Sequence, residues 1–189
     1  MEHFYQNIDG MFDFDDVYKD MINVHSDGAH FVEVGTYMGR SLAYLIVEII
    51  NSGKNIRVGS VDLWEDVQQV TGIQDYKELT FEKFKKNLSP VDGLYTAYRG
   101  FSSTMAEQFD DKSLDFVFID ADHAYESVKK DIEAYLPKIK IGGYIGGHDY
   151  VRDGRKSLTV AKAVREFFEG KIQLPDPSTR KSSWLVQVF

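Results

Sequence analysis

Apolar runs of strand length recur along the chain, separated by polar segments. They lie at 30–35, 56–64, 94–100, 114–120 and 142–147, and a sixth run lies at 183–189. Within 114–120, the letters FVFI are apolar at consecutive positions, which is typical of a strand that is covered on both faces. We therefore predict six strands, at least some of them in the middle of a sheet.

Segments with a helical period lie between these runs. We expect helices at 40–50, 76–88, 102–109, 125–139 and 158–170. Strands that alternate with helices usually pair in parallel through right-handed crossovers. The pattern predicts an α/β fold, a three-layer, doubly wound (Rossmann-like) and mostly parallel sheet.

The last apolar run, 183–189, has no helix after it, so we predict that it enters the sheet as an antiparallel strand. Side chains alternate between the two faces of a strand. Trp184, Val186 and Val188 should therefore face one side of the sheet, and Leu185, Gln187 and Phe189 the other.

Composition narrows the class of protein. A chain of 189 residues fits a single domain, 1–189, and 43% hydrophobic residues are enough for a core. The chain has no cysteine, which excludes disulfides and thiolate zinc sites. The net charge is −8 without a basic stripe, so we expect no nucleic-acid partner.

Neither a membrane span nor a secretory signal is expected. The longest apolar stretch, 42–50, is too short for a bilayer and contains Glu48. The stretch MEHFYQNIDG has no basic region followed by an apolar one. We therefore expect a cytoplasmic protein.

The ends of the predicted strands carry the candidate chemistry, because ligands of doubly wound folds bind there. The first strand ends in EVGTYMGRS, where Gly35 and Gly39 allow a tight turn before a helix. The turn is not a dinucleotide fingerprint and has no phosphate-binding lysine. Glu33 suits a cationic or hydroxyl-bearing ligand, but a plain turn with an exposed acid is an equal alternative.

Asp62 ends the second strand, where ribose-binding acids lie in nucleotide folds, and Trp64 could cover an adenine or close the pocket. The third strand ends in YRGFSS. Ser102 there can cap the next helix, which competes with a ligand contact from Phe101 or Ser102.

The fourth and fifth strands end in acids and histidines. Asp120, Asp122 and His123 follow the fourth strand, and His148 and Asp149 follow the fifth. If these strands are neighbours, like charges crowd together, which is costly unless a cation or a shared proton offsets them. A divalent cation is one solution. The other is a metal-free site with a histidine as general base.

Taken together, the motifs FVEVGTYMGRS, VDLWE, FIDADHAYESVKKDI and GGYIGGHDY resemble those of class I S-adenosylmethionine-dependent methyltransferases. The similarity is greatest to a small bacterial branch that includes macrocin-type sugar O-methyltransferases and relatives of the cephalosporin-biosynthesis methyltransferase. It covers about 32–150. S-adenosylmethionine carries a sulfonium and an ammonium but no phosphate, which agrees with an acidic turn that lacks a phosphate-binding lysine.

The resemblance implies roles for individual residues. Glu33, Gly35 and Gly39 would hold the amino-acid end of the cofactor, Asp62 the ribose, and 100–102 the adenine. The full implied cofactor set is Glu33, Gly35, Thr36, Tyr37, Gly39, Ser41, Asp62, Leu63, Trp64, Gly100, Phe101, Ser102, Asp120 and Asp122.

For catalysis the resemblance implies Asp120, His148 and His123, and for a divalent cation (Mg or Mn) it implies Asp120, His148 and Asp149. His148 stands where the metal-dependent relatives carry an acid, so it could be a ligand or the proton acceptor. We expect His123 to lie outside the centre and to order the following loop.

The resulting prediction is methyl transfer from S-adenosylmethionine to a hydroxyl of a small molecule, of the sugar or secondary-metabolite class. Metal-free N-methylation and a non-catalytic, oligomeric cofactor-binding module are the alternatives. We expect 1–16 to form a cap or lid, and 65–76 and 151–157 to form loops on the substrate side. These three segments could also supply a homo-oligomer contact.

Overall fold

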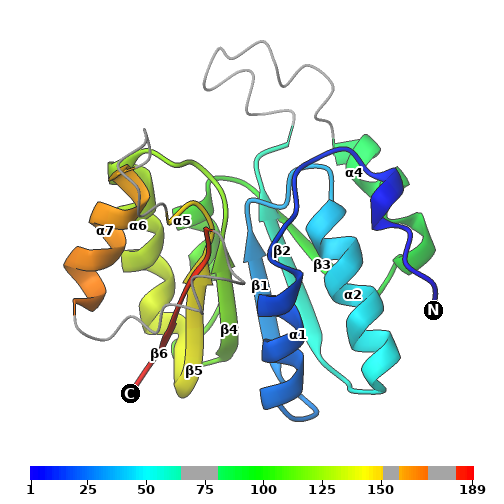
Figure 1. Cartoon of the computed structure of the whole chain (residues 1–189), viewed down its shortest axis with the longest axis horizontal. Helices are drawn as coiled ribbons and strands as arrows, with labels where there is room; N and C mark the ends of the chain where they lie inside the picture. Colours follow the sequence, from blue (N-terminus) through cyan, green and yellow to red (C-terminus); the bar gives the residue numbers. More distant parts are fainter. Residues whose placement is uncertain (65–80, 151–157, 170–181) are drawn as a thin grey trace.

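The computed structural model describes residues 1–64, 81–150, 158–169 and 182–189 (Figure 1). Its strands are β1 (His30–Val34), β2 (Arg57–Asp62), β3 (Thr96–Arg99), β4 (Leu114–Ile119), β5 (Ile139–Gly147) and β6 (Trp184–Gln187). Its α-helices are α1 (Asp15–Val24), α2 (Arg40–Ser52), α4 (Phe81–Asn87), α5 (Ser102–Met105), α6 (Tyr125–Tyr135) and α7 (Leu158–Phe168). Short 3-10 turns are η1 (Tyr5–Asn7), η3 (Ser89–Val91), η4 (Ala106–Gln108) and η5 (Leu136–Lys138).

The six strands form one sheet in the order β3-β2-β1-β4-β5-β6. All neighbours pair in parallel except β5 and β6, which are antiparallel. The predicted fold class and the antiparallel last strand are therefore confirmed. The strand order reverses between β1 and β4, and in such sheets the crevice at this point is the usual ligand site.

Helices cover both faces of the sheet, with α1, α2 and α4 on one side and α5, α6 and α7 on the other (Figure 1). The run FVFI explains how β4 packs against the helices on both faces of the sheet. Phe116 and Phe118 belong to the core under α1 and α2, whereas Val117 and Ile119 belong to the core under α6 and α7. Consecutive apolar residues thus fill two cores because side chains alternate along a strand.

The last strand divides in the same way. Trp184, Val186 and Val188 pack in the core under α6 and α7, and Leu185 packs in the opposite core. The predicted alternation of β6 is confirmed for these residues. The strand ties the C-terminal segment into the sheet.

Some helices differ from the prediction. The helix α1 was not predicted, although Val17, Tyr18, Met21 and Ile22 form an apolar stripe on it that is buried. The predicted helices at 102–109 and 125–139 each consist of an α-helix followed by a 3-10 turn. Of the predicted helix 76–88, the part that the structure describes is helical at 81–87, and 76–80 lie outside the described residues.

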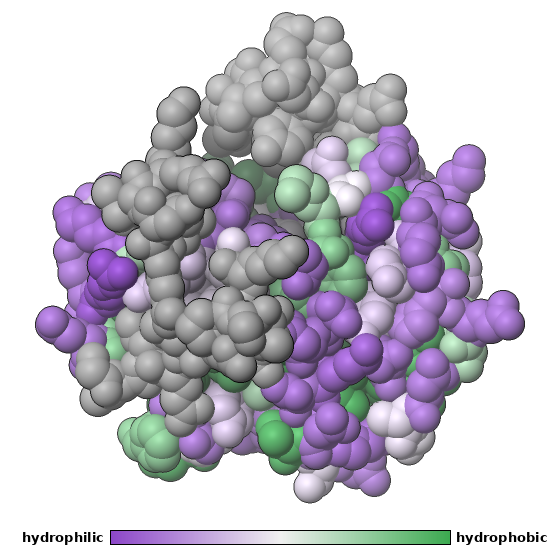
Figure 2. Space-filling view, in the orientation of Figure 1, coloured by the Kyte–Doolittle hydropathy of each residue, from purple (hydrophilic) through white to green (hydrophobic). Residues whose placement is uncertain are grey.

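In the view of Figure 2 the coloured surface is mainly hydrophilic, and its apolar residues occur in small separate groups. This distribution agrees with a core that holds the large apolar side chains. Among the described helices, none has the length and apolar character needed to cross a membrane.

Candidate active site at the carboxyl ends of the strands

The turn after β1 lies directly against the end of β4. The backbone N–H of Gly35 donates to the carbonyl of Val61 at 2.8 Å, and that of Asp120 donates to the carbonyl of Val34 at 2.8 Å. Gly35 has φ +90°, and a Cβ at this position would lie 2.1 Å from the carbonyl oxygen of Asp120. Only glycine fits here, so the two strand ends can approach at the reversal point.

Glu33 lies beneath this turn and not on its open side. Its side chain is 1% exposed, and its carboxylate oxygens accept hydrogen bonds from Tyr18 Oη at 2.6 Å and Ser41 Oγ at 2.7 Å. Burial raises the pKa of Glu33 to about 8, although both hydrogen bonds act in the opposite direction. Glu33 was expected to be accessible at this position. This expectation is wrong, because Glu33 and Ser41 are both buried under the turn. Tyr18, on the unpredicted helix α1, was missed as its partner.

Asp62 instead reaches the turn from the end of β2. Its two carboxylate oxygens accept from the backbone N–H of Tyr37 at 2.7 Å and of Trp64 at 3.0 Å. Tyr37 and Trp64 both have positive φ, 52° and 48°, which is uncommon for residues with a side chain. Burial raises the pKa of Asp62, while the backbone N–H groups lower it.

The remaining predicted cofactor residues divide between the surface and the core. Trp64 is fully buried, packs on Phe84 and donates from Nε1 to the carbonyl of Tyr37 at 3.1 Å. It therefore supports the turn from below, and its predicted contact with an adenine stays a prediction. Thr36 is also buried and accepts from Ser60 Oγ, whereas Leu63 is half-buried. Gly39 starts helix α2 with φ 88°.

At the end of β3, Gly100 donates from its backbone N–H to the carbonyl of Asp62 at 3.0 Å, which places this loop beside the tip of β2. Phe101 is exposed at the start of α5. Ser102 donates from Oγ to Asp131 Oδ1 on α6. Burial raises the pKa of Asp131 to about 6. The serine is thus anchored to α6 and does not cap its own helix.

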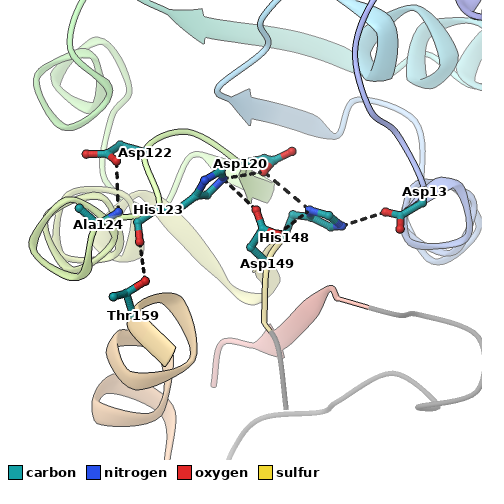
Figure 3. A network of polar contacts seen from close by, with 8 residues as sticks. All are labelled: Asp13, Asp120, Asp122, His123, Ala124, His148, Asp149 and Thr159. Carbon is teal, nitrogen blue, oxygen red and sulfur yellow. Dashed lines mark hydrogen bonds and ion pairs between the residues drawn. The ribbon is translucent and has the colours of Figure 1, made fainter. Parts of the chain in front are cut away.

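Asp120, His123 and Asp149 form the centre of the acidic cluster (Figure 3). His123 Nε2 lies 2.9 Å from Asp149 Oδ2 and 3.5 Å from Asp120 Oδ1. Asp149 has φ 58°, a left-handed backbone conformation that turns its side chain out of the line of β5. The structure therefore brings the ends of β4 and β5 together as the sequence predicted, but with His123 in the middle.

The charges of this cluster offset one another. Hydrogen bonds to Asp120 and Asp149 raise the pKa of His123 to about 10. The hydrogen bonds from His123 and His148 hold the pKa of Asp149 well below its usual range. An imidazolium between two carboxylates is the cation that the crowded acids require.

His148 lies at the edge of the cluster. Its Nδ1 is 3.7 Å from Asp149 Oδ1 and 3.9 Å from Asp120 Oδ1, and its Nε2 is 2.8 Å from Asp13 Oδ1. Burial lowers the pKa of His148, but Asp149, Asp120 and Asp13 outweigh this effect and raise it. Asp13 was missed, since no motif in the N-terminal stretch identifies it.

Asp122, predicted as a cofactor contact, is engaged elsewhere. One oxygen accepts from the backbone N–H of Ala124 at 3.1 Å (Figure 3). The other accepts from Ser127 Oγ at 2.5 Å, and both donors lie at the start of α6. An acid at this place satisfies free N–H groups of the helix start and interacts favourably with its dipole. We therefore assign Asp122 to the helix start and not to the ligand side.

The donor set fits a divalent cation. Asp120, His123 and Asp149 each offer one ligand atom, and these atoms lie within 4.8 Å of one another. Two carboxylates and an imidazole suit Mn²⁺, Fe²⁺, Co²⁺ or Zn²⁺ better than an all-oxygen site would. The predicted ligands Asp120 and Asp149 are together, but the third member of this group is His123 in place of His148.

Comparison with known proteins identifies the family of this chain. Residues 32–150 match a family model described as a methyltransferase domain. This chain belongs to that family. It is an S-adenosylmethionine-dependent methyltransferase, as the motifs predicted, and the match covers the same stretch that carries the resemblance. A search of curated proteins found no match.

Solved structures share the fold. The O-methyltransferase NovP superposes with a TM-score of 0.69 at 17% identity, over 93% of this chain and 79% of NovP. CalS11, a TDP-rhamnose 3'-O-methyltransferase of calicheamicin biosynthesis, has a TM-score of 0.61 at 16% identity, over 92% of this chain and 76% of CalS11. An rRNA methylase from Streptococcus thermophilus has a TM-score of 0.62 at 14% identity, over 95% of this chain and 98% of its own.

The residues around the β1 turn fit S-adenosylmethionine. The contact between Gly35 and the Asp120 backbone keeps side chains out of the turn, and Asp62 presents acceptors at the tip of β2. A ribose diol needs such an acceptor. The amino-acid end of the cofactor would meet backbone groups of the turn, because Glu33 is closed off below it.

Proposed function

We propose that this methyltransferase acts on a hydroxyl group of a small molecule, of the sugar or secondary-metabolite class. The observation that carries the proposal is the cluster of Asp120, His123, His148 and Asp149 at the ends of β4 and β5. A hydroxyl is a weak nucleophile until its proton is removed or its oxygen is polarised. An amine that is already neutral needs neither, so a built cluster of this kind favours a hydroxyl acceptor.

In this proposal the two histidines have different tasks. His123, with a pKa of about 10, is a cation at neutral pH and offsets Asp120 and Asp149. His148 lies beside the pair, with Asp13 at Nε2 and with Asp149 and Asp120 at Nδ1, and we assign it as the proton acceptor for the hydroxyl. S-adenosylmethionine supplies the methyl group when it is bound, and Asp62 holds its ribose.

A divalent cation would be held by Asp120 and Asp149 together with His123, and would polarise the hydroxyl oxygen. Metal binding requires His123 to be neutral, so metal and proton compete for this site. Metal dependence therefore predicts that ion uptake releases protons.

Two features support a small acceptor. NovP and CalS11 are O-methyltransferases of similar fold, and CalS11 acts on a sugar nucleotide. The rRNA methylase shares the fold to a similar degree, but the chain has a net charge of −8 and the cluster is acidic, which disfavours a polyanion.

Turnover with a panel of acceptors tests the proposal. Formation of S-adenosylhomocysteine is measured with nucleotide sugars, phenols, amines and a short RNA, with and without Mn²⁺ or a chelator. We expect turnover that depends on a hydroxyl acceptor. Turnover with amines alone would favour N-methylation, and cofactor binding without turnover across the panel would favour a binding module.

Cofactor binding is tested separately by calorimetry. The wild-type protein should bind S-adenosylmethionine with an affinity on the order of micromolar, about −8 kcal/mol. Asp62→Ala should weaken binding by about 1–3 kcal/mol, because a charged acceptor is lost. Asp62→Asn keeps one acceptor for the Tyr37 N–H and serves as control for the shape of the turn. Equal affinity for all three proteins would contradict the ribose role of Asp62.

A further inference from the structure

Asp131 is a buried acid that the proposed chemistry does not use. It lies on α6 and is 2% exposed. Its Oδ1 accepts from Ser102 Oγ at 2.5 Å, whereas its Oδ2 is buried and has no hydrogen-bond partner among the described residues. A buried polar atom without a partner lowers the stability of a fold. The presence of an acid here therefore needs an explanation other than stability.

A link between α5 and α6 does not require a charge. The two helices lie on the same face of the sheet (Figure 1), and Tyr135 of α6 already donates from Oη to the carbonyl of Ser102 at 3.0 Å. An asparagine at position 131 could also accept from the Ser102 hydroxyl, without the cost of a buried charge. The acid differs from such a neutral group in one respect, because a carboxylate can accept a hydrogen bond but cannot donate one.

The carboxylate therefore fixes the direction of the hydrogen bond to Ser102. A serine hydroxyl has one proton and two lone pairs. Ser102 gives its one proton to Asp131 and keeps only lone pairs for any other partner. The serine is half-buried, in contrast to the buried acid behind it. Towards a ligand, this hydroxyl is an acceptor only.

The loop that carries Ser102 lies where a purine would extend from the ribose site. The backbone N–H of Gly100 donates to the carbonyl of Asp62 at 3.0 Å, so the loop adjoins the acid that suits a ribose diol. In the sheet, β3 is the neighbour of β2 on the side away from β1. The base of a nucleoside is attached to the ribose, so the adenine of bound S-adenosylmethionine would lie against 100–102.

We propose that Asp131 is a positioning residue that makes Ser102 an acceptor, so that Ser102 recognises the 6-amino group of adenine. The amine donates N–H groups, which match the remaining lone pairs of the hydroxyl. A 6-oxo purine presents an acceptor at the same position, and two acceptors that face each other lose a hydrogen bond. The inference concerns selectivity for the cofactor and goes beyond the proposed function, because it does not depend on which acceptor is methylated.

The alternative is that Asp131 only fastens α5 to α6. Replacement of Asp131 would then displace the loop and change the affinity for every nucleoside ligand by the same factor. The ratio of the affinities for an amino purine and an oxo purine separates the two roles. This ratio changes only if the direction of the Ser102 hydrogen bond matters.

Calorimetry with S-adenosylhomocysteine and S-inosylhomocysteine measures this ratio without turnover. The two ligands differ in the amino or oxo group of the purine. Burial raises the pKa of Asp131 to about 6, so titrations at about pH 8 keep the acid charged. The wild type should bind S-adenosylhomocysteine about 100-fold more tightly than the inosyl compound. Equal affinities for the two ligands would overturn the inference.

Two single variants test the pair. Asp131→Asn should lower the preference to about 10-fold or less, because an amide can donate as well as accept and so frees the hydroxyl proton. The variant should melt no earlier than the wild type, since it removes a buried charge. Ser102→Ala should lower the preference to the same level, because no hydroxyl remains. A wild-type preference in either variant would contradict the proposal.

A double variant and a control complete the test. Asp131→Asn added to Ser102→Ala should cause no further loss of preference, because the acid acts only through the hydroxyl. A further loss would show that Asp131 acts by another route, and the positioning role would be wrong. Thr104→Ala removes an exposed hydroxyl of α5 and should keep the wild-type preference. A loss as large as that of Ser102→Ala would refute the assignment to Ser102.

Discussion

Two halves of the candidate site at the carboxyl ends of the strands hold their acids in opposite ways. On the β1 and β2 side, Glu33 and Asp62 are met by hydroxyl and backbone N–H donors, and burial raises the pKa of both. On the β4 and β5 side, Asp149 is met by imidazoles, and its pKa is lowered. In the first half burial disfavours the charged form of the acids, and in the second half the imidazoles stabilise the charged form of Asp149.

The difference matches two tasks. A buried, nearly neutral acid with neutral partners stabilises the shape of a turn that must receive a cofactor. A charged acid beside imidazoles can bind a metal ion or a proton donor in place of the imidazolium. Chemistry at the acceptor requires such groups. We therefore expect changes in the first half to alter stability and cofactor affinity, and changes in the second to alter turnover.

The largest effect is expected where the halves touch. Gly35→Ala would place a Cβ 2.1 Å from the carbonyl oxygen of Asp120 at φ +90°, so β1 and β4 would have to separate. We expect a loss of about 3–5 kcal/mol in the free energy of unfolding, measured by chemical denaturation. Gly53→Ala, also at positive φ but with no atom within 4 Å, should cost only about 1–2 kcal/mol. Equal losses for the two variants would show that the strand ends are not in contact.

The next effect concerns the pH dependence of stability. The folded pKa of Glu33 is about 8, above its ordinary 4.5, so between these values the folded chain keeps a proton that the unfolded chain has lost. Stability should therefore fall as pH rises through this window, by up to about 1.4 kcal/mol per pH unit. Denaturation from pH 5 to 8 should show a shallower fall for Glu33→Gln. The exposed Glu107 supplies the control, because Glu107→Gln should follow the wild type.

The smallest predicted effect separates turnover from binding. Asp149→Asn removes the charge that His123 contacts at 2.9 Å and should lower kcat about 100-fold, about 2.7 kcal/mol. The affinity for S-adenosylmethionine should stay near the wild-type value, in contrast to Asp62→Ala. Stopped assays of product formation measure kcat, and calorimetry measures the affinity for S-adenosylmethionine. If Asp149→Asn instead loses affinity and keeps kcat, Asp149 serves cofactor binding, and the two halves do not have separate tasks.

Patterns of hydrophobicity were enough to predict the sheet. The alternation of strands and helices predicted parallel pairing, and the consecutive apolar residues of β4 predicted cover on both faces. The motifs at the strand ends predicted the family and brought Asp120 and Asp149 together. These features are periodic or contiguous in sequence, and each residue's role follows from its place on a strand.

Which polar groups meet was decided by the tertiary structure alone. The sequence does not reveal that Glu33 is buried and Asp62 partly exposed, since both acids lie near the carboxyl end of a parallel strand. His123, at the start of a loop, was expected outside the centre but reaches both acids, and Asp13 comes from the far end of the chain. A pattern along the chain sets the face on which a side chain lies. Its partner, and hence its charge, depends on which distant element packs beside it and on how much water that packing removes.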